Sequence, residues 1–293
     1  MKPSAHILQA LQRSKLLVRG AVASTGIGER KSRKVGSGMD FADFREYAPG
    51  DETRHLDARL YARFGSFYVR QYDVDMQLPI TIVVDGSRSM LGGGGDKLTM
   101  ALWLANVLGY TALRSSDQVQ LAFWSGAGLD VSRRMAGTNK YRELSEWLER
   151  QQSEGPAPFE TCFAGLGDAL PERGLVILIS DFWMGALEGN LGLLAAKGSE
   201  LWAMQLLSRG EIDPTTMPEG EETVTDAESG ETVAIAIDQT ALDGYQALLE
   251  EHQSALHHAF TALGGRHNLI ATDADFEAFV LHEMGAAGML SRV

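Results

Sequence analysis

The feature that most constrains the fold is an alternation of short apolar runs with longer segments of helical periodicity, which begins at residue 78. The run at 78–84 (LPITIVV) is rich in β-branched residues, and the apolar residues of 96–117 recur at helical spacing. Strands that are apolar on both faces, each followed by a helix, indicate a mostly parallel sheet between two helical layers. We therefore predict a doubly wound, Rossmann-like α/β fold. Further strands are predicted at 118–124, 174–180, 199–207 and 267–272.

Two segments interrupt this pattern. Residues 1–77 precede the first predicted β-α unit, so we expect an N-terminal segment at 1–77 and the α/β domain at 78–293. Residues 208–237 are rich in Asp, Glu, Pro and Gly and contain a predicted hairpin that turns at Ser229 and Gly230. We interpret this stretch as a surface insertion. The chain is predicted to close with a helix over 273–285, with Asp273 as its N-cap.

The charge of the chain is unevenly distributed. The net charge is -13, yet residues 1–77 carry 13 Lys or Arg against 9 Asp or Glu. The strongly acidic remainder disfavours nonspecific binding to nucleic acid. The basic stretch 28–34 (GERKSRK) either forms a small contact surface or is a solvated loop.

Cysteine content and hydropathy bear on the compartment. A single cysteine, Cys162, excludes an internal disulfide framework. No apolar run approaches the roughly 20 residues that span a bilayer, and the N-terminal residues do not form the core of a signal peptide. We expect a cytoplasmic protein.

A pattern of oxygen-bearing side chains follows the first predicted strand, as Asp85-x-Ser87-x-Ser89. A second predicted strand ends in Asp181, and Thr161 lies between the two in sequence. In open α/β sheets, ligands bind beyond the carboxyl ends of the strands, where these side chains fall. Carboxylates and hydroxyls are hard ligands that suit Mg²⁺, with Mn²⁺ or Ca²⁺ as alternatives. The competing interpretation is an ordinary polar turn.

The same residues resemble the metal-ion-dependent adhesion site of the von Willebrand factor A domain family. The resemblance lies in VVDGSRSM, the later Thr161 and LISDF, and it implies a divalent cation held by Asp85, Ser87, Ser89, Thr161 and Asp181. Many members of that family have an Asp after the Thr, whereas this chain has Cys162. A supporting role for that neighbouring position is therefore not carried over.

A second resemblance covers residues 36–73, which are similar to the hallmark segment of the bacterial DUF58 family. Members of that family join such a segment to a von Willebrand A-like domain and are often associated with MoxR-type AAA+ ATPases. The resemblance thus implies a protein partner of that kind. The matching positions include Arg45, Tyr47, Gly50, Asp51, Arg54, Asp57, Ala62 and Arg63.

Two functional hypotheses follow. The first is a non-enzymatic, metal-dependent protein-binding module, an adaptor or co-chaperone of a MoxR-type ATPase in complex maturation or stress response, with a client that supplies a carboxylate. The second is a magnesium-dependent hydrolase or phosphotransferase with Asp85 as nucleophile. The sequence offers no evident general acid or base beside Asp85 and no lysine near the site to hold a phosphate, which favours the first. Cys162, the histidines of 252–258 and GLGDAL at 165–170 form no recognisable catalytic, metal or nucleotide motif.

Overall fold

The computed structural model describes residues 2–19, 31–35, 40–49, 51, 53, 56–75, 77–92, 97–155, 165–167, 170, 173–183, 187–216 and 220–292. The chain divides into two compact units. The sheet unit consists of Met1–Val18 with Leu78–Val293, and the small unit is Arg19–Gln77. One edge of the small unit coincides with the predicted boundary at 77/78. The first 18 residues, which the sequence analysis grouped with the N-terminal segment, pack with the sheet unit instead.

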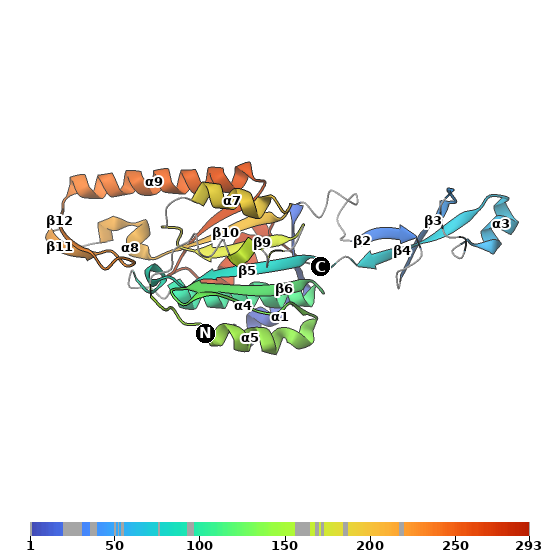
Figure 1. The fold of residues 1–293 in the computed structure, drawn as a ribbon, viewed down its shortest axis with the longest axis horizontal. Coiled ribbons are helices and arrows are strands. Elements are labelled where there is room, and N and C mark those ends of the chain that lie inside the picture. The colour runs from blue at the N-terminus through green and yellow to red at the C-terminus, as the bar shows by residue number, and fades with distance from the viewer. Residues whose placement is uncertain are drawn as a thin grey trace. The chain divides into compact units, whose positions relative to one another are not determined.

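The sheet unit is built on a seven-stranded sheet with the order β13-β10-β9-β5-β6-β7, and β8 pairs with β6 (Figure 1). The strands from β13 to β6 run parallel, while β7 and β8 are antiparallel to β6. The predicted doubly wound, mostly parallel α/β fold is therefore confirmed. The strands are β5 (Pro79–Asp85), β6 (Gln118–Ser125), β7 (Gly128–Val131), β8 (Met135–Ala136), β9 (Leu175–Ser180), β10 (Glu200–Leu207) and β13 (Arg266–Ala271).

Helices cover both faces of the sheet. Figure 1 shows α4 (Lys97–Arg114) and α5 (Tyr141–Glu149) on one face, and α7 (Leu187–Ala195) and α9 (Gln239–Ala262) on the other. Strands β5, β9 and β10 are almost entirely buried between these layers, because both of their faces meet helices. No helix in the described ranges is long and apolar enough to cross a membrane.

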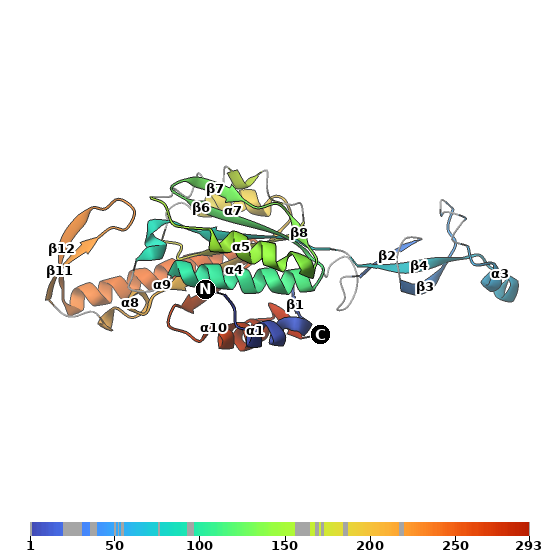
Figure 2. The same ribbon diagram turned by 90° about the horizontal axis from the view of Figure 1, so that it is seen from below.

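The two ends of the sheet unit lie together. Strand β1 (Ser14–Leu16) pairs antiparallel with β14 (Leu290–Arg292), and α1 (Ala5–Ala10) lies close to α10 (Phe276–Ala278) in Figure 2. Asp275 caps α10 by accepting a hydrogen bond from the Ala278 amide, so the predicted cap at Asp273 was wrong. The helical segment therefore begins three residues later than the predicted start at 273. It continues from α10 through a π-helical turn (Phe279–Glu283) into α11 (Met284–Ala286).

The order of the strands creates a switch point between β5 and β9. The chain passes from β5 to β6 on one side and then returns to place β9 on the other side of β5. Val84 pairs with Ile179 in register, so both strands end at the same edge of the sheet. Crevices at such points are the usual ligand sites of open α/β sheets. This register brings the polar residues after β5 and β9 together.

The insertion between β10 and α9 contains a short helix and a hairpin. Helix α8 (Arg209–Ile212) follows β10, and β11 (Gly220–Thr225) pairs antiparallel with β12 (Thr232–Ile237). Gly230 in the connecting turn has φ 74°, a left-handed conformation that favours glycine. The predicted hairpin is present, with its turn where Ser229 and Gly230 placed it.

The described residues of the small unit include a three-stranded antiparallel sheet in the order β2-β4-β3 and the helix α3. Within it, Arg45 Nη2 donates to both carboxylate oxygens of Asp51, at 2.8 and 2.9 Å. The Ala48 amide and Arg45 together lower the pKa of Asp51. The Arg45–Asp51 ion pair is thus formed within the small unit. Arg54 lies outside the described residues. The elements are β2 (Lys31–Val35), β3 (Asp40–Glu46), α3 (Ala58–Phe64) and β4 (Tyr68–Asp75).

Gly86, directly after β5, tests the packing that supports the site. A Cβ atom there would lie 2.1 Å from Cζ of the buried Phe123 ring. We expect Gly86→Ala to lower the free energy of unfolding by about 1–3 kcal/mol through overpacking. Gly244, exposed within α9 with nothing near its Cβ position, is the control. Gly244→Ala should raise stability by up to about 1 kcal/mol. Urea unfolding measures both, and an unchanged Gly86→Ala variant would contradict the packing described.

Candidate functional site

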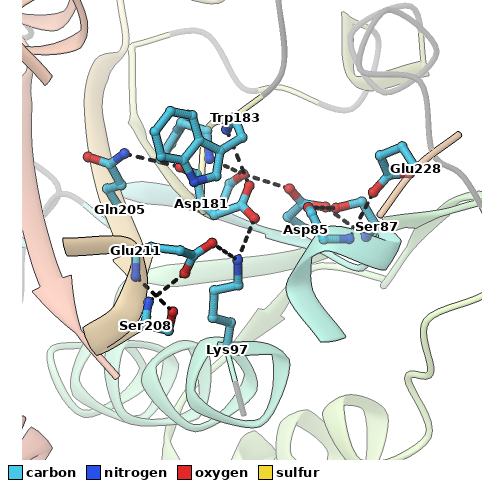
Figure 3. Close-up of polar contacts among 12 residues, drawn as sticks. Asp85, Ser87, Lys97, Asp181, Trp183, Gln205, Ser208, Glu211 and Glu228 are labelled. Carbon is cyan, nitrogen blue, oxygen red and sulfur yellow. Dashed lines mark hydrogen bonds and ion pairs between the residues drawn. The ribbon is translucent and has the colours of Figure 1, made fainter. Parts of the chain in front are cut away.

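The loop after β5 gathers three of the predicted residues. Asp85 is fully buried at the strand end, and its Oδ1 accepts a hydrogen bond from the Ser87 amide at 2.8 Å (Figure 3). The hydroxyls of Ser87 and Ser89 lie 3.0 Å apart and share a hydrogen bond. A short 3-10 turn, Arg88–Leu91, follows Ser87 and keeps the chain compact here. The structure therefore brings Asp85, Ser87 and Ser89 to one place at the edge of the sheet.

Ser180 is a site residue that sequence reasoning missed. It ends β9 beside Asp85, and its hydroxyl donates to Asp85 Oδ2 at 2.6 Å. The same hydroxyl accepts from the Phe182 amide at 2.9 Å. One carboxylate oxygen of Asp85 is thus oriented by a donor from its own loop, the Ser87 amide, and the other by a donor at the end of β9, the Ser180 hydroxyl. Only the register between β5 and β9 reveals this role, since nothing in the LVILIS run marks its last serine.

Asp181 lies on the turn that leaves β9. It is buried, and its Oδ1 accepts from the Trp183 amide at 3.3 Å. The next residue, Phe182, has φ 58°, an uncommon left-handed conformation for a bulky residue, and its ring is buried in the core against Phe260. Gln205 of β10 donates to the main-chain oxygen of Asp181 at 3.1 Å. The strained turn therefore places the Phe182 ring in the core while Asp181 stays at the sheet edge.

Lys97, at the start of α4, is the second residue that sequence reasoning missed. Its Nζ lies 2.8 Å from Asp181 Oδ2 and 2.8 Å from Glu211 Oε1, and its side chain is 1% exposed. Glu211 is held in turn by a capping box with Ser208 at the start of α8. Burial alone lowers the pKa of Lys97, but the two carboxylates raise it above its ordinary value. The sequence analysis found no lysine near the site that could hold a phosphate, and Lys97, which does lie there, has its ammonium group committed to two carboxylates. A lysine in the first turn of an otherwise apolar helix was the available signal.

The charges of this group do not balance. The site holds three carboxylates, those of Asp85, Asp181 and Glu211. Among the described residues, one ammonium group, that of Lys97, pairs with two of them, Asp181 and Glu211. Burial raises the pKa of Asp85 to about 7, and the nearby charge of Asp181 raises it as well. Hydroxyl and amide donors orient Asp85 but do not neutralise it. A buried group with excess negative charge and several hard oxygen atoms has the chemistry that suits a divalent cation.

Thr161, the remaining predicted residue, and Cys162 lie outside the described residues. Four of the five predicted ligands thus stand at the edge formed by β5 and β9. Their role in holding a metal stays a prediction. The described part of the chain contains no group of three His, Cys, Asp or Glu side chains arranged for a metal ion. The four predicted ligands in the described residues are two carboxylates and two hydroxyls, so they do not form a group of that kind.

Two further contacts reach the loop after β5. Ser153 donates from its hydroxyl to the main-chain oxygen of Ser87 at 3.2 Å. Glu228, in the turn of the β11–β12 hairpin, accepts a hydrogen bond from the Ser89 amide at 2.8 Å (Figure 3). Neither contact was predicted, because both residues are far from the loop in sequence. The hairpin that the sequence analysis placed at the surface therefore touches the site.

The histidines of α9 have other surroundings. The His252 ring stacks on Trp183 with 4.7 Å between centroids, and His257 lies near His267 of β13. Burial, with the charges of His257 and His252, lowers the pKa of His267 to about 4. His252 thus packs on Trp183, whose amide donates to Asp181. In the described residues these histidines are not part of any cluster of side chains that could hold a metal ion.

The family follows from comparison with known sequences. The family described as "protein of unknown function DUF58" matches residues 43–255, which is more than half of the chain. The chain therefore belongs to the DUF58 family, as residues 36–73 indicated. Two curated relatives, the uncharacterized proteins Mb1516 of Mycobacterium bovis and Rv1480 of Mycobacterium tuberculosis, are each 26% identical over 283 residues. Each alignment covers 93% of this chain and 87% of the relative.

Solved structures with a similar chain path include a bacterial protein and a VWA domain. BatB, a conserved hypothetical protein from Bacteroides thetaiotaomicron, is 11% identical with a TM-score of 0.43, covering 72% of this chain and 98% of its own. The VWA domain of SpRpn10 is 11% identical with a TM-score of 0.39, covering 71% and 95%. Such low identities leave the ligands of this chain to be argued from its own residues.

Lys97 provides a test of the buried charges. Lys97→Met removes the cation shared by Asp181 and Glu211 and leaves the buried Asp181 carboxylate uncompensated. We expect the free energy of unfolding in EDTA to fall by about 3–5 kcal/mol. Lys140→Met is the control, since its pair with Glu143 is largely exposed and should contribute less than about 1 kcal/mol. Equal effects in the two variants would show that Lys97 does not support the site.

Proposed function

We propose that this chain is a non-enzymatic protein-binding module whose binding surface is completed by a divalent metal ion. The observation that carries the proposal is the buried, incompletely neutralised pair Asp85 and Asp181 at the switch point, with the hydroxyls of Ser87 and Ser89 beside Asp85. Following the DUF58 resemblance, we assign it as an adaptor or co-chaperone of a MoxR-type AAA+ ATPase in complex maturation or stress response, acting in the cytoplasm.

The side chains that would hold the metal are Asp85, Ser87, Ser89 and Asp181, together with Thr161. Mg²⁺ suits this oxygen set best, and Mn²⁺ or Ca²⁺ are the alternatives. When bound, the cation supplies a positive centre that attracts a carboxylate from a partner protein. The serine hydroxyls contribute no negative charge, and the Ser87 amide and Ser180 hydroxyl keep the Asp85 carboxylate oriented at the sheet edge. The side chains of the site would therefore hold the cation while neutralising only part of its positive charge.

The alternative is a magnesium-dependent hydrolase or phosphotransferase that uses Asp85 as nucleophile. Asp85 is fully buried, and each of its oxygens already accepts a hydrogen bond. Lys97 is also buried, with its ammonium committed to Asp181 and Glu211. A phosphate clamp needs a cation that faces the substrate, so this arrangement favours the binding module.

Metal binding is the first test of the proposal. Calorimetry should detect Mg²⁺ or Mn²⁺ binding to the full chain, and a saturating excess should raise its melting temperature, because the ion binds the native state. At about 100 times Kd, the gain corresponds to about 2.7 kcal/mol. Asp85→Ala should abolish both effects, whereas Asp243→Ala, an exposed site on α9, should leave them unchanged. Equal affinity in the wild type and an Asp85→Ala, Asp181→Ala variant would refute the site.

Partner binding is the second test. A MoxR-type ATPase from the same genome should be retained by the immobilised chain in Mg²⁺ and released in EDTA. Ser87→Asp should weaken retention even with metal bound, because another anionic ligand lowers the attraction of the cation for an incoming carboxylate. Full retention in EDTA would reject metal dependence. Loss in EDTA with full retention by Ser87→Asp would keep the metal and reject carboxylate capture.

A further inference from the structure

The β11–β12 hairpin carries an apolar face that the chain does not cover. Val224 and Val233 are cross-strand partners, and Ile235 and Ile237 follow Val233 at alternate positions of β12, so they share its face. Ile237, at the base of the hairpin, is only 7% exposed. Farther along the same face, Val224, Val233 and Ile235 are 48%, 60% and 40% exposed. A two-stranded hairpin with an unburied apolar face is marginal in water, so this one is suited to receive a further strand.

The outer edge of β12 is free to receive that strand. Among the described strands, β11 alone pairs with β12. Beside the turn, the Asp226 amide donates to the main-chain oxygen of Glu231 at 2.8 Å. Because bonded and non-bonded pairs alternate in an antiparallel ladder, the amide and carbonyl groups of Thr232 and Ala234 point away from β11. The sequence of β12, TVAIAI, also lacks the charged residues and proline that usually protect an edge strand.

The surroundings of this edge are strongly acidic. Residues 210–265, which include the hairpin and α9, contain 12 Asp or Glu and no Lys or Arg. The whole chain has 26 Lys or Arg and 39 Asp or Glu, so this stretch accounts for 12 of the 13 net negative charges. A second copy of the chain is a poor occupant of the edge, since two such acidic stretches repel each other. A segment with basic residues beside its apolar ones is attracted instead.

The hairpin also lies next to the candidate metal site. The Ser89 amide donates to Glu228 Oε1 at 2.8 Å, which joins the turn of the hairpin to the loop after β5 (Figure 3). A partner that contacts the site can therefore reach β12 with a neighbouring segment.

We propose that the outer edge of β12 binds an extended segment of a partner protein in which Lys or Arg alternate with apolar residues. The segment adds a third strand to the hairpin through main-chain hydrogen bonds. Its apolar side chains lie beside Val233 and Ile235, and its basic side chains interact with the acidic residues around the hairpin. This inference rests on the proposed protein-binding function but not on the bound metal.

The probe is a capped peptide of about eight residues, the length of a short strand, with alternating Lys and Val. A peptide of the same composition with its Lys and Val in two separate blocks is the control. In EDTA, the alternating peptide should slow hydrogen exchange of residues 220–237 in the full-length protein, as read by mass spectrometry, and the block peptide should not. Ile235→Thr keeps a β-branched residue but removes apolar area, so it should weaken binding about tenfold by calorimetry.

Proline variants locate the binding edge. Ala234→Pro removes an amide that points away from β11, and Thr223→Pro removes the corresponding amide at the opposite edge of the hairpin, since the two residues pair across the strands. The first variant should lose binding of the alternating peptide, and the second should bind it as the wild type does.

Equal affinity in the two proline variants would overturn the inference, as would equal affinity of the wild type for the two peptides or no protection of 220–237. Dimerisation of the wild type in sedimentation, lost in Ala234→Pro, would assign the edge to a second copy and overturn it as well. These measurements are made without metal, so each of these results leaves the proposed metal site standing. Conversely, a failure of Mg²⁺ to bind the wild type would leave binding at β12 intact.

Discussion

Two carboxylates buried at the switch point of the sheet are the constraint on which the rest of the site depends. Asp85 ends β5 and Asp181 directly follows the adjacent parallel strand β9, so the register of the two strands brings their charges together. Lys97 relieves part of this repulsion by pairing with Asp181 and Glu211. The remaining excess makes the apo site costly to keep ionised, and burial raises the pKa of Asp85 to about 7. Under the proposed function, a bound divalent cation would offset this excess of negative charge.

The arrangement of hydrophobic segments was sufficient to predict the fold, because strands buried on both faces leave few alternatives to a doubly wound sheet. Asp85, Ser87, Ser89 and Asp181 were also predictable, since each follows the end of a recognisable strand. Ser180, Lys97, Glu211 and Glu228 were not. Their roles depend on strand register, on where α4 begins in space and on a hairpin that crosses from a distant insertion. Sequence periodicity carries none of that information.

The central claim is that a divalent cation binds at the oxygen atoms after β5 and β9. Crystals grown with Mn²⁺ and measured near the manganese absorption edge test it most directly, because anomalous scattering locates the ion without assumptions about its ligands. The account predicts one strong peak within about 2.0–2.6 Å of oxygen atoms from the Asp85, Ser87 and Ser89 group. Ordered crystals in excess Mn²⁺ with no peak there, or with peaks only at surface carboxylates, would contradict it.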